Sequence, residues 1–190
     1  MTAAPPFSLP RTLVLVGLMG AGKTAVGKRV AARLDLGFVD ADQAIEEAAG
    51  CSVPDIFERY GEPAFRDLER RVIARLVQGP VQVLSTGGGA FMDPETRAVI
   101  ADRGLSVWLK ADLAVLAART AKRHNRPLLR QGDPKAILAG LIERRHPLYA
   151  LADLTVESRD GPVEETVDRV MAAIETHLAA ETPLIETHRT

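Results

Sequence analysis

The sequence predicts an α/β fold built on a parallel sheet, and three observations lead to that prediction. Five short apolar runs rich in Val and Leu are spread along the chain. Segments whose apolar residues recur at helical spacing separate these runs. The first run leads directly into Gly17-Leu-Met-Gly-Ala-Gly-Lys-Thr24, a glycine-rich stretch that fits G-x-x-x-x-G-K-[ST]. Strands that alternate with helices favour parallel pairing through right-handed crossovers.

The strand predictions rest on the length of the apolar runs. Runs this short cannot form core helices, and their Val and Leu content is typical of strands that are buried on both faces. The expected strands are 12–16, 38–39, 81–84, 106–109 and 154–156. Two of the intervening helices each place apolar residues on one face: Val26, Val30 and Leu34 in the first, and Phe65, Leu68, Val72 and Leu76 in the second.

The composition is that of one soluble globular domain. The chain has 190 residues, of which 46% are hydrophobic and 26% charged, and this excludes disordered, collagen-like and disulfide-scaffold proteins. A net charge of -1 provides no field that would attract nucleic acid or a membrane surface. Cys51 is the single cysteine, no apolar stretch reaches the length of a membrane span, and the N-terminus lacks the pattern of a signal peptide. We therefore expect a cytoplasmic monomer with no nucleic-acid and no membrane partner.

The domain is expected to cover residues 11–178. Residues 1–10 contain three prolines and are expected to form a flexible N-terminal tail, and residues 179–190 a C-terminal tail. Residues 122–134 are polar and basic and are bounded by proline and glycine. That pattern predicts a long functional loop.

The glycine-rich stretch 17–24 has the chemistry of a phosphate-binding loop. Its backbone N–H groups would point toward phosphate oxygens, and the N-terminus of the next helix adds partial positive charge. Lys23 would reach the β- and γ-phosphates, and the Thr24 hydroxyl would ligate Mg²⁺. The alternative is a glycine-rich turn with a surface lysine. The loop alone does not name a reaction, because GTPases, ATPases, motors and small-molecule kinases all use it.

Two carboxylates, those of Asp40 and Asp42, follow the second expected strand. Side chains two residues apart in an extended segment point to the same side, so one could orient a hydroxyl while the other serves the metal. The alternative is that Asp42 caps the next helix. Beside a phosphate loop, the pair favours the functional interpretation.

Arg66 and Glu69 are three residues apart on an expected helix whose first turn contains Pro63, so they are neighbours on the helix surface. Taken alone, they suit an ordinary surface ion pair. Together with the other motifs, they suit an anion-binding arginine that a carboxylate holds in place.

Three consecutive glycines, Gly87 to Gly89, follow the third expected strand. They indicate backbone that approaches a ligand and offers N–H groups to a phosphate or carboxylate. A tight turn is the alternative.

Basic residues mark two later segments. Arg126, in the expected loop, would bring a guanidinium over the transferring phosphoryl group, with a solvated basic loop as the alternative. Arg144, Arg145 and His146 are placed at the end of a helix that we expect Pro147 to interrupt. Cations at that position also complement a helix C-terminus, and His146 has no partner at metal-binding spacing.

The order of these motifs resembles that of a known enzyme family. The motifs are Gly-x-Met-Gly-x-Gly-Lys-Thr, Asp-x-Asp, Phe-Arg-x-x-Glu, Thr-Gly-Gly-Gly, Arg-Pro-Leu-Leu and Glu-Arg-x-x-Pro-Leu-Tyr. Between Arg11 and Val170 the chain closely resembles the shikimate kinases. The resemblance implies a three-layer P-loop kinase fold with a five-stranded parallel sheet flanked by helices and a mobile lid. It also implies transfer of the ATP γ-phosphate to the 3-hydroxyl of shikimate, in chorismate biosynthesis.

The resemblance assigns residues to the nucleotide and the metal. The nucleotide-binding positions are Gly20, Ala21, Gly22, Lys23, Thr24, Ala25, Arg119 and Arg126. Arg119 is the implied stacking partner of adenine, Arg126 the lid arginine, and Thr24 with Asp40 the magnesium site. Lys23, Asp40 and Arg126 are the implied catalytic residues. Many relatives carry a second hydroxyl residue where this chain has Ala25, so one phosphate contact is absent.

The resemblance also assigns the acceptor site to Asp42, Arg66, Gly88 and Arg145. Asp42 would accept hydrogen bonds from shikimate hydroxyls, and the two arginines would hold the carboxylate through forked donors. Two alternatives remain: another small-molecule kinase of this architecture, such as a gluconate-type kinase, and a non-catalytic nucleotide-binding regulator. A gluconate-type acceptor need not engage both arginines.

Overall fold

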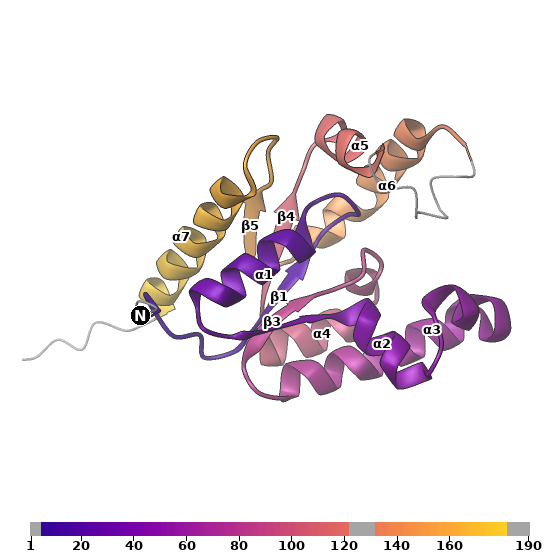
Figure 1. Ribbon diagram of the computed structural model, residues 1–190, viewed down its shortest axis with the longest axis horizontal. Coiled ribbons are helices and arrows are strands. Elements are labelled where there is room, and N and C mark those ends of the chain that lie inside the picture. Colours follow the sequence, from indigo (N-terminus) through magenta and orange to yellow (C-terminus); the bar gives the residue numbers. More distant parts are fainter. Residues whose placement is uncertain (1–4, 122–131, 182–190) are drawn as a thin grey trace, which may run out of the picture.

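A five-stranded parallel sheet in the order β2-β3-β1-β4-β5 forms the centre of the fold (Figure 1). The computed structural model describes residues 5–121 and 132–181. The strands are β1 (Thr12–Val16), β2 (Gly37–Asp40), β3 (Gln82–Ser85), β4 (Gly104–Lys110) and β5 (Leu154–Glu157). The helices described are α1 (Lys23–Arg33), α2 (Ala41–Ala49), α3 (Val53–Gln78), η1 (Ala90–Met92), α4 (Pro94–Arg103), α5 (Leu113–Ala121), α6 (Pro134–Tyr149) and α7 (Val163–Glu181). All five expected strands are confirmed.

Helices cover both faces of the sheet, which gives the fold three layers. On one face α1 packs against α7, and α7 also contacts β5 (Figure 1). On the other face α4 contacts β4 and packs against α3. In the described ranges, no helix combines the length and apolar character needed to span a bilayer.

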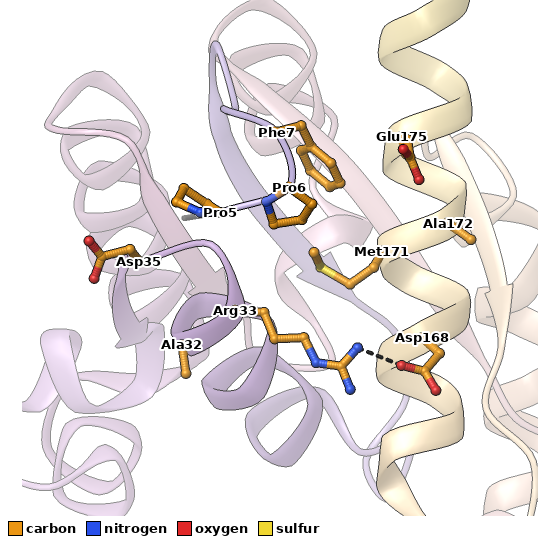
Figure 2. Close-up of a pocket in the computed structure, with 10 residues that line it drawn as sticks. All are labelled: Pro5, Pro6, Phe7, Ala32, Arg33, Asp35, Asp168, Met171, Ala172 and Glu175. Atoms are coloured by element: carbon orange, nitrogen blue, oxygen red, sulfur yellow. Dashed lines mark hydrogen bonds and ion pairs between the residues drawn. The ribbon is translucent and has the colours of Figure 1, made fainter. Parts of the chain in front are cut away.

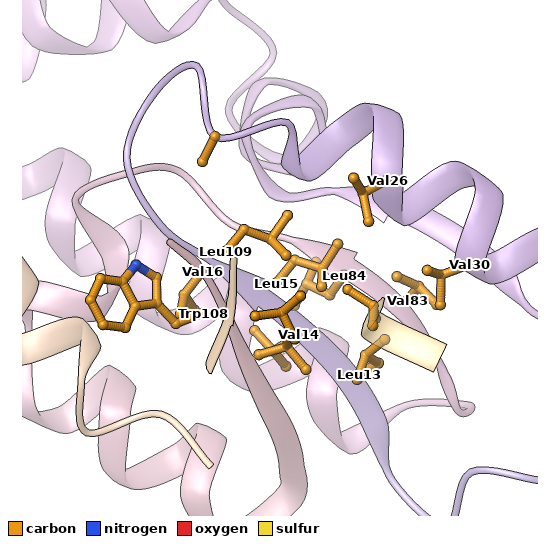
Figure 3. Packing of buried hydrophobic residues seen from close by; sticks show 14 of the residues in the cluster. Leu13, Val14, Leu15, Val16, Val26, Val30, Val83, Leu84, Trp108 and Leu109 are labelled. Atoms are coloured by element: carbon orange, nitrogen blue, oxygen red, sulfur yellow. The ribbon is translucent and has the colours of Figure 1, made fainter. Parts of the chain in front are cut away.

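The core is densest around the central strand. Leu13, Val14, Leu15 and Val16 of β1 are each 0% exposed, because strands flank β1 on both sides and helices cover both faces. Figure 3 shows these side chains together with others of the cluster from α1, β3 and β4. The predicted face of α1 is also confirmed, since Val26, Val30 and Leu34 are all buried.

The two edge strands differ from the expectation that all strands are buried on both faces. In β2, Phe38 and Val39 are only half-buried, and in β5 Thr155 is exposed while Val156 is buried. An edge strand has a neighbouring strand on one side only, so its side chains have fewer packing partners.

Two prolines lie inside helices, and the structure separates their effects. α3 is broken at Gly61, whose φ of 78° is left-handed, and Pro63 then occupies the first turn of the second segment, as expected. The expectation that Pro147 interrupts its helix is wrong. α6 continues to Tyr149, and the N–H of Ala150 still donates to the carbonyl of His146 at 2.9 Å.

The N-terminal segment touches the domain before residue 11. Leu9 is 8% exposed within the core, and Phe7 packs against it. Figure 2 shows Phe7 beside a surface cavity of about 630 Å³ between this segment, the end of α1 and α7. Arg33 on α1 donates to Asp168 on α7 at 2.5 Å at the edge of that cavity. This cavity lies at the end of α1 opposite to the glycine-rich loop.

Candidate active site

The carboxyl ends of four strands bring the expected site residues to one edge of the sheet. The glycine-rich loop follows β1, Asp40 ends β2, Thr86 follows β3 and Ser158 follows β5. A cavity of about 470 Å³ opens there. Its lining includes Gly20, Gly22, Lys23, Thr24, Ala25, Asp40, Asp42, Arg66, Gly88, Arg119 and Arg145. Of the other expected residues, Ala21 is buried in the loop, and Arg126 lies outside the described residues together with 122–131.

The glycine-rich loop has a backbone that only glycine adopts easily. Gly17, Gly20 and Gly22 have φ values of 138°, 84° and 97°. A Cβ on Gly17 would also lie 2.7 Å from the carbonyl oxygen of Leu109. Gly22 is the N-cap of α1, so the N–H groups of the first helical turn face the cavity edge. This is the arrangement that binds phosphate groups.

Lys23 folds back over the loop. Its side-chain nitrogen donates to the carbonyl oxygen of Gly17 at 2.7 Å and to that of Leu18 at 3.1 Å. The residue is 9% exposed and lines the cavity. A lysine in this position places its positive charge beside the loop that would cradle the phosphates.

Thr24, in the first turn of α1, is hydrogen-bonded to Asp40 at the end of β2. The Thr24 hydroxyl donates to Oδ2 of Asp40 at 3.1 Å. Asp40 also caps α2, accepting from the N–H of Asp42 at 3.1 Å. The alternative that Asp42 is the cap is therefore wrong: Asp42 lies in the first turn of α2, and its carboxylate lies close to Gly87.

A hydroxyl and a carboxylate fit a magnesium ion. Mg²⁺ prefers hard oxygen ligands and is commonly bound through one or two carboxylates plus the substrate's phosphates. Thr24 and Asp40 supply such oxygens beside the phosphate loop.

The three consecutive glycines make room for charged side chains. They form a tight turn in which the N–H of Ala90 donates to the carbonyl oxygen of Gly87 at 3.2 Å, so the turn alternative is also confirmed. None of the three has a positive φ, so the turn by itself does not require glycine. A Cβ on Gly87 would lie 2.9 Å from Oδ1 of Asp42, and a Cβ on Gly89 would lie 2.6 Å from both terminal nitrogens of Arg66. Glycine at these positions lets the two charged side chains lie against the backbone, and a larger residue would displace them.

The Arg66–Glu69 pair is not an ordinary surface ion pair. Nη1 of Arg66 donates to Oε2 of Glu69 at 2.7 Å, and Glu69 is 2% exposed. Burial raises the pKa of the Glu69 carboxyl above its usual value, and Arg66 opposes that rise. Partial burial lowers the pKa of Arg66, but Glu69 and Glu62 raise it by more. Arg66 is thus a charged group whose guanidinium is held at the cavity wall.

Arg145 reaches the same wall from α6. Its Nη1 donates to the carbonyl oxygen of Gly88 at 3.0 Å. The hydroxyl of Tyr149, one turn later, donates to the same oxygen. Sequence reasoning did not assign a role to Tyr149, although it belongs to the Glu-Arg-x-x-Pro-Leu-Tyr motif.

Arg119 is fixed at the opposite end of the cavity. It donates to the Ser158 hydroxyl at 2.9 Å and to the carbonyl oxygen of Arg159 at 2.5 Å. Ser158, 2% exposed, donates in turn to the carbonyl oxygen of Ala21 at 2.8 Å. Ser158 was missed from the sequence, and its signal is its place directly after the last strand, at the carboxyl edge.

Comparison with known proteins identifies the family. The family model described as shikimate kinase matches residues 19–175. The chain belongs to the shikimate kinase family. It is 58% identical over 171 residues to a shikimate kinase of Paramagnetospirillum magneticum, covering 90% of this chain and 88% of that one. It is 56% identical to a shikimate kinase of Ruegeria pomeroyi, covering 89% and 87%.

A solved structure of a shikimate kinase supports the same family assignment. The enzyme from Acinetobacter baumannii in complex with shikimate superposes with a TM-score of 0.82 at 35% identity, covering 91% of this chain and 96% of that chain. A gluconokinase from Sinorhizobium meliloti has a TM-score of 0.57 at 16% identity, which shows a shared fold alone. As a shikimate kinase family member, the chain is a phosphotransferase that uses ATP with Mg²⁺.

Proposed function

We propose that this chain transfers the γ-phosphoryl group of ATP to the 3-hydroxyl of shikimate, giving shikimate 3-phosphate and ADP. One observation carries the proposal: a phosphate loop and a pair of arginines suited to a carboxylate line the same cavity of about 470 Å³. Both substrates can therefore meet without a rearrangement of the sheet. Phosphoryl transfer depends mainly on such positioning and on charge stabilisation.

The nucleotide end of the cavity would hold ATP. The backbone of the loop and the first turn of α1 would bind the β- and γ-phosphates, and Lys23 would add its charge. Thr24 and Asp40 would hold Mg²⁺, which when bound offsets charge on the phosphate oxygens. Arg119, fixed by its bond to Ser158, would present its guanidinium plane to adenine.

The other end would hold the acceptor. Arg66 and Arg145 present forked donors that match a planar carboxylate. Asp42 accepts hydrogen bonds, which suits neighbouring hydroxyl groups. Asp40, which is bonded to Thr24 and to the N–H of Asp42, would act on the reacting hydroxyl, either by orienting it or as a base. An acceptor that is both an acid and a polyol satisfies all of these groups.

Arg126 completes the proposal as the arginine that stabilises the transferring phosphoryl group. It lies outside the described residues, and its role rests on the Arg-Pro-Leu-Leu motif. Replacement of Arg126 by Ala should depress kcat by about a hundredfold or more while the Kd of shikimate alone stays nearly unchanged. Normal turnover by that variant would remove Arg126 from the catalytic set.

A coupled ADP-release assay tests the function. ATP is supplied with shikimate, gluconate or a nucleoside monophosphate in turn. We expect turnover with shikimate alone, because the two arginines and Asp42 together fit its carboxylate and hydroxyls. Faster turnover of gluconate would favour the gluconate-type alternative, and no turnover with any acceptor would favour the nucleotide-binding regulator.

We further propose that the protein acts in the cytoplasm as a monomer. The single cysteine and the near-zero net charge support this, since neither suggests an oxidising compartment or a charged surface partner. Sedimentation at several protein concentrations tests the monomer: a mass that rises with concentration would contradict it.

A further inference from the structure

Tyr149 places a buried hydroxyl against the acceptor side of the cavity. It is the last residue of α6 and is 0% exposed. Its ring stacks on Phe91 with the centroids 6.3 Å apart and on Trp108 with the centroids 5.9 Å apart. These neighbours belong to η1 and to β4, so core packing from two elements fixes the ring. The hydroxyl position is therefore set independently of any bound ligand.

The Tyr149 hydroxyl and the Arg145 guanidinium donate to the same hydrogen-bond acceptor, the carbonyl oxygen of Gly88. The two residues are four apart on α6 and lie on the same helix face. Arg145 donates to the carbonyl oxygen of Gly88 at 3.0 Å, and the Tyr149 hydroxyl donates to the same atom. A carbonyl oxygen has two lone pairs and can accept both bonds.

The bond from Tyr149 to the Gly88 oxygen matters because Arg145 has two partners to serve, that oxygen and the carboxylate of the substrate. In the structure its Nη1 is bonded to Gly88, whereas in the proposed complex its donors face the acceptor carboxylate. A partly buried carbonyl that loses its hydrogen bonds is penalised. With Tyr149 present, the Gly88 oxygen keeps one bond when Arg145 turns to the substrate.

We propose that Tyr149 is a positioning residue for the acceptor: its hydroxyl holds the Gly88 carbonyl and so leaves Arg145 available to the substrate carboxylate. The proposal rests on the function proposed above. It assigns to Tyr149 an effect on shikimate binding that acts through Arg145 and leaves the nucleotide end unchanged.

The hydroxyl keeps its proton under working conditions. Burial raises the pKa of Tyr149 to about 12, against the opposing effect of the Arg145 charge. Tyr149 therefore remains a donor at neutral pH, which the bond to a carbonyl oxygen requires.

Kinetics of Tyr149→Phe test the proposal, since this change removes the hydroxyl and keeps the ring. We expect the KM of shikimate to rise by about five- to tenfold, the equivalent of one hydrogen bond, and the KM of ATP to change by less than about twofold. Tyr60→Phe is the matched control, because Tyr60 is the chain's other tyrosine and is 65% exposed. It should leave both constants unchanged. Equal rises in both constants, or loss of folding by circular dichroism, would show a merely structural role and overturn the proposal.

A double-mutant cycle with Arg145→Gln asks whether Tyr149 acts through Arg145. Shikimate dissociation constants can be followed by the fluorescence of Trp108, the single tryptophan, or by calorimetry. In the Arg145→Gln background, Tyr149→Phe should weaken shikimate binding by less than about twofold. Effects that multiply in the double variant would mean independent action and overturn the proposal. A wild-type chain that does not phosphorylate shikimate would overturn the proposed function, whereas an active wild type with an unaffected Tyr149→Phe would overturn this inference alone.

Discussion

The buried Glu69 carboxylate accepts a hydrogen bond at 2.7 Å from the Arg66 guanidinium, and that guanidinium fills the space beside Gly89 where a Cβ would stand. The arginine is therefore confined between a charge partner and a backbone that has no side chain. Such confinement lowers the entropy lost when a ligand carboxylate binds.

Arg66→Lys keeps the charge and removes the forked donors. The KM of shikimate should rise by about tenfold or more, and the KM of ATP much less, because a lysine cannot bind a carboxylate through two parallel bonds. Arg70→Lys is the matched control: Arg70 lies on the same helix, pairs with Asp67 at 2.7 Å and has the same side-chain exposure of 33%. Similar kinetics for the two variants would assign Arg66 a structural role.

Gly89→Ala should expel the Arg66 guanidinium from its place. The added Cβ would lie 2.6 Å from both terminal nitrogens, so the arginine must move, and shikimate binding should weaken by about tenfold. In the control Gly37→Ala, the Cβ meets nothing within 4 Å. Calorimetric titration with shikimate compares the two. Unchanged affinity in Gly89→Ala would mean that the position of Arg66 does not limit binding.

The protonation of Glu69 should appear in the pH dependence of shikimate binding. Its pKa is raised by burial, so the carboxylate takes up a proton at a higher pH than an exposed glutamate does. As the pH falls toward that pKa, Arg66 keeps its bonds to Glu62 but loses the charge of Glu69, its buried partner, and the KM of shikimate rises. The KM of shikimate is measured between about pH 5 and about pH 8. Glu69→Gln should have a higher KM than the wild type, and its KM should lack the rise at low pH that protonation of Glu69 causes. If the KM of shikimate changed with pH in the same way in the wild type and in Glu69→Gln, protonation of Glu69 would not be the cause.

Lys23→Met should preserve the fold and lower kcat by about a hundredfold or more, because the charge beside the phosphates is lost. The side chain lies outside the apolar core, so the chain should still fold, but loss of the bonds to the carbonyl oxygens of Gly17 and Leu18 should lower the melting temperature by a few degrees. Lys135→Met, at an exposed position on α6, serves as the control for loss of a lysine charge. Turnover near the control level would contradict the assignment of Lys23.

Ala25→Ser restores a hydroxyl that many relatives carry in the first turn of α1. If this hydroxyl can donate to a phosphate, the KM of ATP should fall by about two- to fivefold, with no change for shikimate. Ala32→Ser, exposed farther along the same helix, controls for the effect of serine on the helix itself. An unchanged KM of ATP would show that the loop already satisfies the phosphates.

Local patterns were sufficient for the strands and the phosphate loop. Each strand contains one of the short runs rich in apolar residues, and the loop motif lies between β1 and α1 as expected. The lower burial of the edge strands β2 and β5 could not be predicted from local patterns, because it depends on which strands have a neighbour on both sides. The capping role of Asp40 was likewise hidden, since both Asp40 and Asp42 carry a suitable oxygen and only the backbone angles at the start of α2 decide between them.

Contacts between distant segments account for the rest of the site. Asp42 and Arg66 lie against Gly87 and Gly89, and those residues are far away in the sequence. Tyr149 has an apolar ring, so it fits a core position, and its hydroxyl bond to Gly88 spans 61 residues. No periodicity encodes such a pairing.

The central claim is that this chain phosphorylates the 3-hydroxyl of shikimate, and the most direct test is to identify the product. The purified protein is incubated with ATP, Mg²⁺ and shikimate, and the mixture is analysed by phosphorus and proton NMR. We predict one new phosphate ester whose phosphorus couples to the proton on carbon 3 of shikimate, formed in equal amount with ADP. An ester at another carbon, or ADP without a phosphorylated shikimate, would contradict the account.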